Sequence, residues 1–246
     1  MWNEPQYIDL FDKEKGLPFL IKQIESGAME KVELMLTDPP YNVKFDGSLQ
    51  SDPSKCPGAN PHCYDDQTFY NDDIEDYVLW STLWFTLAKQ VADKIIFTCG
   101  NKNIAMWYSI EKPLDMFVHY KKNCMSQTSL ARFNRWEPLL LYGNFRHKFD
   151  FLCNVFDVLV EAGGKKTRTI HPTPKPVDLY HLIIKRLKVK SVIDPFFGSG
   201  AVGEACLMLD VPFIGYEINP EYKPDWEKRK KFVLENKNDE TNFMDI

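Results

Sequence analysis

The sequence predicts one α/β domain in which a mostly parallel sheet is covered by helices. Short apolar runs alternate with longer amphipathic stretches along the chain, which is typical of this class. The length of 246 residues suits a single domain with a sizeable core and is too short for two ordinary ones. A hydrophobic fraction of 44% and an aromatic fraction of 14% are typical of a globular protein. We therefore treat residues 1–246 as one domain.

Seven candidate strands and five candidate helices follow from this alternation. The strands are expected at Tyr7–Phe11, Glu33–Thr37, Lys94–Thr98, Met116–Tyr120, Pro138–Tyr142, Ser191–Asp194 and Pro212–Glu217. The helices are expected at Leu17–Ser26, Glu75–Ala92, Val177–Leu187, Ala201–Leu209 and Glu221–Asn236. Residues 43–74 and 144–170 interrupt the alternation. The first segment is rich in Asp, Ser, Pro, Gly and Asn, so we expect a mobile, functional loop there.

The net charge of −5 conceals an uneven distribution along the chain. Residues 1–77 carry 16 acidic and 6 basic side chains, whereas residues 119–170 carry 4 acidic and 9 basic ones. A basic segment of this kind suits contact with nucleic-acid phosphates, although an ordinary solvated surface explains it equally well. The nine candidate phosphate contacts are Lys121, Lys122, Arg132, Arg135, Arg146, Lys148, Lys165, Lys166 and Arg168.

Several classes of protein are excluded by what the sequence lacks. No apolar run reaches the roughly 18 to 20 residues of a membrane span, and the first residues lack the regions of a signal peptide. The six cysteines are scattered, so we expect free thiols and a cytoplasmic location. Cys56, His62 and Cys63 offer half of a zinc site, but a second ligand pair at suitable spacing is missing, and we expect no metal.

A glycine-rich turn follows the candidate strand Ser191–Asp194. The sequence from Gly198 to Gly203 has the spacing used where a strand, a tight turn and a helix cradle a nucleotide, although tight turns also collect glycine for steric reasons. The next strand ends in Glu217, whose carboxylate can accept hydrogen bonds from a ribose or can cap a surface turn. These residues leave open a dinucleotide or a nucleoside with a charged tail.

A second candidate site is Asp38-Pro39-Pro40-Tyr41, directly after the strand Glu33–Thr37. Ligands bind beyond the carboxyl ends of strands in open parallel sheets. The two prolines make the backbone rigid, so the Asp38 carboxylate, the Pro39 carbonyl and the Tyr41 ring keep a set arrangement. Acceptors and a stacking ring suit the amino group of a base, which becomes nucleophilic only as its nitrogen turns tetrahedral. The alternative is a simple proline turn.

Taken in order, five segments carry a family resemblance. They are Thr37–Asn42, Glu137–Gly143, His171–Pro176, Asp194–Gly200 and Gly215–Ile218. With them the chain resembles, over nearly its whole length, the β class of amino-group DNA methyltransferases, in which the catalytic motif precedes the cofactor motif. The resemblance implies the Rossmann-like fold of class I S-adenosylmethionine-dependent methyltransferases. It implies a seven-stranded, mostly parallel sheet with one antiparallel edge strand and a circularly permuted motif order.

The resemblance also implies the roles of individual residues. Asp38, Pro39, Pro40 and Tyr41 would line a pocket for a base swung out of duplex DNA, with Asp38 orienting its amino group for direct methyl transfer. S-adenosylmethionine would be the cofactor. Its implied contacts are Thr173, Lys175, Pro176, Asp194, Phe196, Gly198, Gly200 and Glu217. The strand Tyr7–Phe11 resembles the segment that binds the cofactor adenine, with Asp12 as its acid, although Phe11 stands where glycine is usual.

The target base and its recognition are less defined. Asp at the first tetrapeptide position is more usual for adenine N6 and Ser for cytosine N4, so we expect adenine, with cytosine as the alternative. The recognition region is reduced to residues 144–170, and an amphipathic packing helix at Phe149–Val160 is equally compatible with its sequence. RNA as substrate, a catalytically silent nucleic-acid-binding subunit and a Rossmann-like oxidoreductase are the competing interpretations. The recognised sequence, a restriction enzyme partner and a homodimer stay open.

Overall fold

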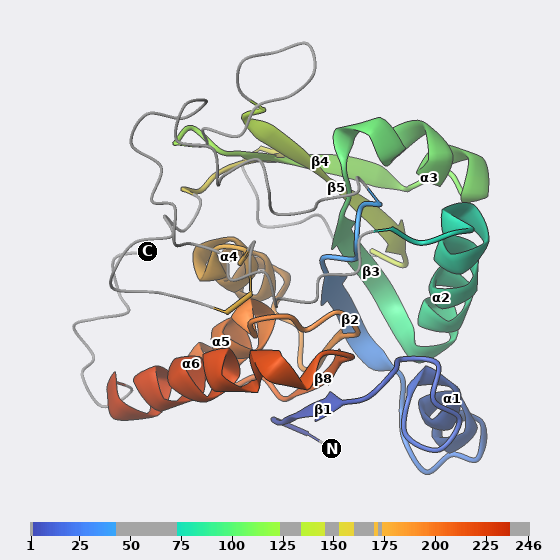
Figure 1. Ribbon diagram of the computed structural model, residues 1–246, viewed down its shortest axis with the longest axis vertical. Helices are drawn as coiled ribbons and strands as arrows, with labels where there is room; N and C mark the ends of the chain where they lie inside the picture. Colours follow the sequence, from blue (N-terminus) through green and yellow to red (C-terminus); the bar gives the residue numbers. More distant parts are fainter. Residues whose placement is uncertain are drawn as a thin grey trace.

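The computed structural model describes residues 2–42, 73–123, 134–145, 153–159, 170–171 and 174–236. In these residues an eight-stranded sheet lies between two groups of helices (Figure 1). The strands are β1 Pro5–Tyr7, β2 Val32–Thr37, β3 Ala92–Thr98, β4 Asp115–Tyr120, β5 Trp136–Gly143, β6 Val155–Asp157, β7 Val192–Asp194 and β8 Phe213–Glu217. The helices are α1 Leu17–Glu25, α2 Tyr77–Val91, α3 Ile104–Ile110, α4 Val177–Leu187, α5 Ala201–Met208 and α6 Lys223–Asn236, with 3₁₀ turns η2 Asn101–Asn103 and η3 Pro220–Tyr222.

The strand order of the sheet is β1-β8-β7-β2-β3-β5-β4-β6. Strand β5 runs antiparallel to both of its neighbours, and all the other pairings are parallel. The predicted α/β class and mostly parallel sheet are therefore confirmed, with one strand more than the seven expected. The prediction that the antiparallel strand forms an edge is wrong, because β5 lies inside the sheet between β3 and β4.

The core has two parts, one on each face of the sheet. Alternate side chains of β2 show the division: Leu34 and Leu36 pack with α4, α5 and α6, whereas Met35 packs with α1, α2 and α3. Figure 1 shows these two helical layers, the first in orange and red and the second in blue to green. Strands covered on both faces are apolar throughout, which explains the continuous runs in the sequence.

Two elements were missed by the sequence interpretation. Helix α3 is too short for its periodicity to be read, although Trp107 within it is fully buried. Strand β6 lies in the segment for which an amphipathic helix was the alternative, and that alternative is wrong for residues 153–159. Here Phe156 and Val158 are buried while Val155, Asp157 and Leu159 are exposed, which is the two-residue period of a strand.

The first strand is displaced relative to the prediction. It ends at Tyr7, which lies opposite Glu217 of β8, and residues 8–11 turn away from the sheet toward α1. The predicted loop begins after Asn42, whose side chain donates to the Ile74 carbonyl (3.2 Å) and accepts from the Ile74 amide (2.7 Å). Residues 43–72 of that loop lie outside the described residues.

Within the described ranges, none of the helices is long and apolar enough to cross a membrane.

Candidate active site

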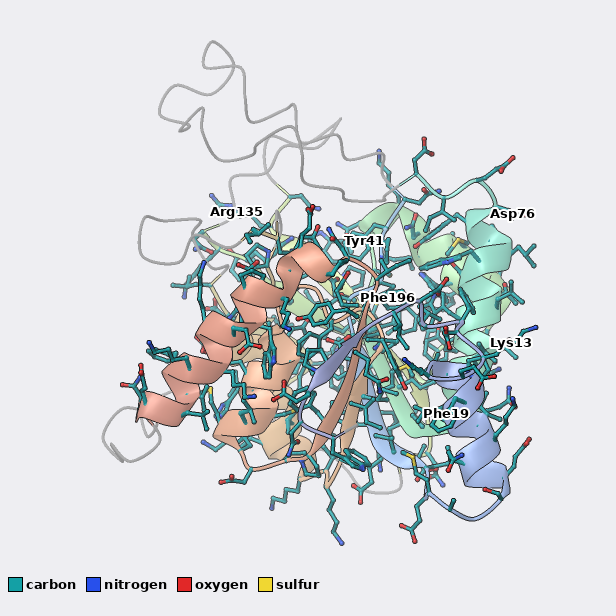
Figure 2. All side chains as sticks on the ribbon, turned by 60° about the horizontal axis from the view of Figure 1, so that its bottom comes forward. Lys13, Phe19, Tyr41, Asp76, Arg135 and Phe196 are labelled. Carbon is teal, nitrogen blue, oxygen red and sulfur yellow. The ribbon has the colours of Figure 1, made fainter. Side chains whose placement is uncertain are left out.

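A cavity of about 470 Å³ lies at the carboxyl ends of β1, β2, β7 and β8. Its lining includes residues 8–11 after β1, Asp38 and Pro40 after β2, Trp80 of α2, residues 194–199 after β7 and residues 217–219 after β8. Phe196 and Tyr41 lie near the centre of the view in Figure 2, whereas Lys13 and Asp76 lie at its periphery. The two candidate sites of the sequence thus meet at one edge of the sheet.

The glycine-rich turn at this edge is shaped by backbone conformation and by a buried ring. Gly198 and Gly200 have φ angles of +52° and +86°, which strain any residue with a Cβ. A Cβ on Gly203, in α5, would lie 2.6 Å from the Phe197 ring, and one on Gly200 would lie 2.9 Å from it. The third glycine therefore lets Phe197 pack beneath the turn, a steric role that the sequence pattern alone does not reveal.

Glu217 joins the end of β8 to this turn. Its Oε2 accepts a hydrogen bond from the Gly198 amide (2.7 Å) and its Oε1 accepts one from the Asn219 amide (2.8 Å). The side chain lines the cavity, and burial raises the pKa of its carboxyl group. Glu217 therefore caps a turn, as one interpretation had it, but a buried turn rather than a surface one. The ribose contact stays a prediction.

Asp194 and Phe196 form another wall of the cavity. Asp194 Oδ1 accepts hydrogen bonds from Thr37 Oγ1 (2.5 Å) and from the Phe196 amide (3.1 Å). Burial raises the pKa of the Asp194 carboxyl group to about 7. The Phe196 ring packs against Trp80 and Trp84, at centroid distances of 5.5 and 5.3 Å. This wall combines an aromatic surface with a carboxyl group whose charged form is disfavoured by burial.

The acid predicted for the adenine-binding segment is Asp12, but another acid of that segment faces the cavity. Asp12 Oδ1 accepts from the amides of Glu14 (2.8 Å) and Lys15 (2.9 Å), and Asp12 is absent from the described cavity lining. Asp9 does line it. The sequence prediction extended the first strand to Phe11. It therefore placed the end of the strand too far along the chain and selected Asp12 instead of Asp9.

The tetrapeptide Asp38-Pro39-Pro40-Tyr41 follows β2 directly and is held by side chains of α2 and η2. Tyr77 Oη donates to the Pro40 carbonyl (2.7 Å), and Asn103 Nδ2 donates to the Tyr41 carbonyl (2.6 Å). Tyr41 Oη donates to Asp38 Oδ1 (2.6 Å), and the Thr98 hydroxyl donates to the same oxygen. Burial and the adjacent Asp38 carboxylate raise the pKa of the Tyr41 phenol well above its ordinary value, so it remains a donor.

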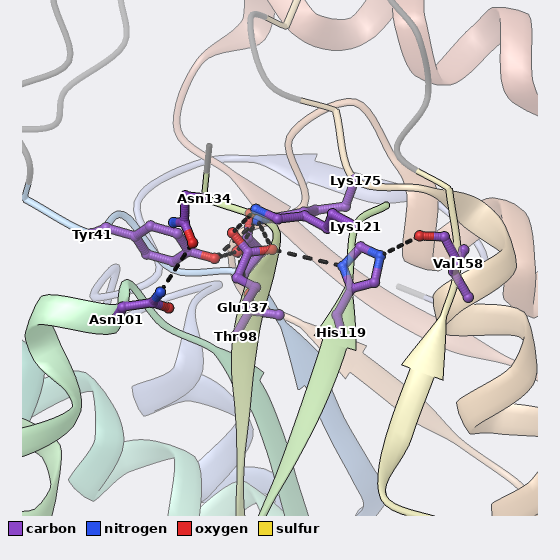
Figure 3. Close-up of polar contacts among 10 residues, drawn as sticks. Tyr41, Thr98, Asn101, His119, Lys121, Asn134, Glu137, Val158 and Lys175 are labelled. Carbon is purple, nitrogen blue, oxygen red and sulfur yellow. Dashed lines mark hydrogen bonds and ion pairs between the residues drawn. The ribbon is translucent and has the colours of Figure 1, made fainter. Parts of the chain in front are cut away.

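Lys175, expected at the cofactor, lies against the Asp38 carboxylate. Its Nζ is 3.2 Å from Asp38 Oδ1, 2.9 Å from Glu137 Oε2 and 2.9 Å from Tyr41 Oη, to which it donates (Figure 3). Burial opposes its charge, but the Asp38 and Glu137 carboxylates raise the pKa of the Lys175 ammonium to about 12. Lys175 also lines the cavity, so it touches both parts of the site. Glu137 entered the sequence prediction only as the first residue of the segment Glu137–Gly143, and neither a role for Glu137 nor its contact with Lys175 was predicted.

The remaining predicted site residues are distributed unevenly. Pro176 precedes α4 and is not part of the described cavity lining, whereas Thr173 lies outside the described residues. Among the basic side chains, Lys121 is buried in an ion pair with Glu137 (3.3 Å), Lys122 pairs with Asp157 at the surface (3.0 Å), and Arg135 is exposed. The structure therefore does not offer Lys121 to phosphates. Arg132, Arg146, Lys148, Lys165, Lys166 and Arg168 lie outside the described residues.

The described ranges contain no cluster of metal-binding side chains. No group of three or more His, Cys, Asp or Glu side chains there could hold a metal ion. Three cysteines are described and all are free: Cys99, Cys153 and Cys206. The half-site noted in the sequence, Cys56, His62 and Cys63, lies outside these ranges.

Comparison with solved structures defines the class of fold. The chain superimposes on the crystal structure of an M1.HpyAVI–SAM complex with a TM-score of 0.60 and 20% identity, over 87% of this chain and 95% of that one. It matches the cytosine-N4-specific PvuII DNA methyltransferase with a TM-score of 0.59 and 14% identity, over 85% of each chain. The fold is that of the class I S-adenosylmethionine-dependent methyltransferases.

Sequence comparison adds similarity to DNA methyltransferases. The family model N6_N4_Mtase, described as DNA methylase, matches residues 144–228. The chain is 26% identical over 252 residues to the Type II methyltransferase M.HinfI of Haemophilus influenzae, covering 89% of this chain and 68% of the relative. It is 25% identical over 231 residues to M.HpaI of Haemophilus parainfluenzae, covering 82% and 69%. In sequence the chain is thus similar to Type II methyltransferases, and its segment 144–228 matches the N6_N4_Mtase model.

Proposed function

We propose that the protein transfers a methyl group from S-adenosylmethionine to an exocyclic amino group in DNA, with adenine N6 as the acceptor. The observation that carries the proposal is the position of Asp38. Asp38 is the first residue after β2, and its carboxylate lines the same cavity as Asp194 and Glu217. A hydrogen-bond acceptor for an amino group is therefore next to a cavity large enough for a nucleotide. The relatives named as Type II methyltransferases support DNA as the substrate.

The charge of the cavity supports S-adenosylmethionine over a dinucleotide. Six carboxyl groups line it, from Asp9, Asp38, Asp73, Glu75, Asp194 and Glu217. Of its two basic side chains, Lys175 is already paired with carboxylates, while burial and nearby cations lower the pKa of His171 to about 3. An acidic lining favours a cation and disfavours a pyrophosphate. The residues present therefore fit a cofactor that supplies a methyl group bonded to a cationic sulfur.

Each wall has a role in this proposal. Glu217 would accept hydrogen bonds from the ribose hydroxyls, and Asp9 would accept one from the adenine amino group. The rings of Trp80 and Phe196 would cover the adenine. Asp194, beside the glycine-rich turn, would face the charged tail. These residues would hold the cofactor in the cavity that Asp38 also lines, and the cofactor would supply the methyl group.

At the tetrapeptide, the chain's own groups would prepare the base. Asp38 and the Pro39 carbonyl accept the two amino hydrogens, which favours the tetrahedral nitrogen whose lone pair can react. With the cofactor bound, that lone pair would bond to the methyl carbon, the carbon–sulfur bonding pair would stay on the departing thioether, and the nitrogen would lose a proton to water. The Asp38 charge stabilises the positive charge that develops on the nitrogen. The Tyr41 ring provides a surface on which the flipped base stacks.

A labelling experiment tests the proposal. Duplex DNA is incubated with the protein and S-adenosylmethionine carrying a labelled methyl group, then digested to nucleosides and separated. We expect label in N6-methyladenine. Label in N4-methylcytosine would correct the base and keep the reaction. No label in duplex DNA, with label in RNA incubated in parallel, would replace the substrate, and no label in either polymer would contradict the proposed function.

A further inference from the structure

The Asp38 carboxylate is held through one of its two oxygens. Oδ1 receives the Tyr41 hydroxyl, the Thr98 hydroxyl and the Lys175 ammonium. Within the part of the chain that the structure describes, no hydrogen bond or ion pair reaches Oδ2. Three donors on one oxygen fix the orientation of the carboxylate and leave the second oxygen available as an acceptor.

This arrangement brings a full positive charge next to the group that has to stabilise one. An ammonium paired with Asp38 alone would cancel much of the negative potential that a target nitrogen requires as it becomes cationic. Glu137 changes this balance. Its Oε2 lies 2.9 Å from Lys175 Nζ, closer than the 3.2 Å between Nζ and Asp38 Oδ1. The ammonium is therefore shared between two carboxylates.

Glu137 is itself fixed by buried neighbours. Its side chain is 9% exposed, its Oε1 is paired with Lys121 (3.3 Å), and His119 Nδ1 lies 3.8 Å from Oε2. His119 is fully buried and its Nε2 is hydrogen-bonded to the Val158 carbonyl oxygen at 2.8 Å. Figure 3 shows Glu137 between Lys175 and His119, facing the same end of the strands as Tyr41. With a lysine ammonium beside each of its oxygens, this buried carboxylate has little freedom to move.

The reversed strand explains how Glu137 reaches the site. Because β5 runs antiparallel to β3, with Leu139 opposite Thr98, the start of β5 lies at the edge where β3 ends. Glu137 is the second residue of β5 and pairs with His119 of β4. A parallel strand at this position would instead end at that edge. The antiparallel strand thus delivers its first side chains to the carboxyl ends of its neighbours.

We infer that Glu137 is a positioning residue for methyl transfer that acts through Lys175. By sharing the ammonium, it lets Lys175 orient Asp38 through Oδ1 without neutralising it, and Oδ2 stays free for the target amino group. The inference rests on the proposed function. In the described part of the chain Glu137 does not line the cavity, so its effect falls on the transfer step and not on cofactor binding.

The test begins with Glu137→Gln, which keeps the shape and removes the charge. Lys175 is then attracted by Asp38 alone. We expect the single-turnover rate at saturating cofactor and DNA to fall by about 10-fold to 100-fold, the scale of a small misplacement of reacting groups. The dissociation constant for S-adenosylmethionine should change by less than about twofold, roughly 0.4 kcal/mol. Glu111→Gln, which removes an acid from the exposed pair with Lys89, is the matched control and should leave both values unchanged.

A double-mutant cycle separates this role from a general effect on folding. If Glu137 acts through Lys175, then Glu137→Gln should cost little further rate in a Lys175→Met background. Glu137→Asp keeps the negative charge but places it farther from Lys175, so this variant should lose less rate than Glu137→Gln. It also serves as the second variant if Glu137→Gln does not fold. A wild-type rate for Glu137→Gln, an equal loss in both backgrounds or a loss confined to cofactor affinity would overturn the inference. Absence of transfer by the wild-type protein would instead contradict the proposed function.

Discussion

Thr37 Oγ1 donates a hydrogen bond of 2.5 Å to Asp194 Oδ1, although the two residues are 157 positions apart in the chain. Thr37 ends β2 and immediately precedes Asp38, whereas Asp194 ends β7 and begins the glycine-rich turn. Both side chains are buried. One hydrogen bond therefore joins the strand that carries the tetrapeptide to the strand that carries the proposed cofactor site, and it depends on Asp194 as an acceptor.

The first prediction concerns the pH dependence that Asp194 gives to stability. Its pKa is about 7 in the folded protein and near the ordinary value of 3.8 when unfolded, so the folded state binds the extra proton between these values. Its contribution to stability is present at low pH and is lost as pH rises through 7. Asp194→Asn keeps the Oδ1 acceptor and removes the titration. We expect the variant to gain on the order of 2 to 4 kcal/mol over the wild-type protein from pH 5 to pH 8.

Urea denaturation of both proteins across that range measures the difference. The other titrating groups are common to the two proteins and cancel in the comparison. Parallel stability curves for wild-type protein and Asp194→Asn would show that the Asp194 pKa is not raised. Asp194→Ala, which removes the acceptor as well, should in addition weaken S-adenosylmethionine binding.

The second prediction distinguishes Asp9 from Asp12 in cofactor binding. Asp9 lines the cavity and its Oδ1 accepts the Phe11 amide (2.9 Å), whereas Asp12 is absent from the described cavity lining and accepts two amides of its own turn. Asp9→Asn replaces a charged acceptor and should raise the dissociation constant for S-adenosylmethionine by about 10-fold. Asp12→Asn should leave that constant within about twofold. Titration calorimetry, or quenching of tryptophan fluorescence, compares the cofactor affinities of the two variants. The reverse order of effects would restore Asp12 as the contact.

The third prediction tests the packing beneath the glycine-rich turn. A Cβ at position 203 would lie 2.6 Å from the Phe197 ring, in a part of the core that also contains Trp226. Gly203→Ala should therefore lower the free energy of unfolding by about 1 to 3 kcal/mol, the cost of overpacking. Phe197→Leu in the same chain removes the clash with Phe197 and leaves the 2.9 Å contact with Trp226, so the Gly203→Ala step should cost less than it does in the wild-type background. Equal costs in the two backgrounds would mean that Phe197 is not the obstacle.

Much of this architecture could be predicted because it depends on local sequence. The two prolines after β2 and the glycine-rich turn after β7 indicate where these strands end. Because these two strands are parallel, their carboxyl ends lie at the same edge of the sheet. The pairing of Glu137 with Lys175 could not be predicted in this way. It requires β5 to be reversed inside the sheet, and the strand order is set by long-range packing. Asp9 was missed for a local reason, since an apolar run shows a strand but defines its end poorly.

In the proposed reaction, Asp38 prepares an amino group of DNA for methylation beside a bound S-adenosylmethionine. To test this role of Asp38, methylated nucleosides are measured in duplex DNA treated with wild-type protein or Asp38→Ala, together with the cofactor affinity of each protein. We expect N6-methyladenine from the wild-type protein, a loss of at least about 100-fold for the variant and nearly equal cofactor affinities. Undiminished methylation of DNA by Asp38→Ala would contradict the account.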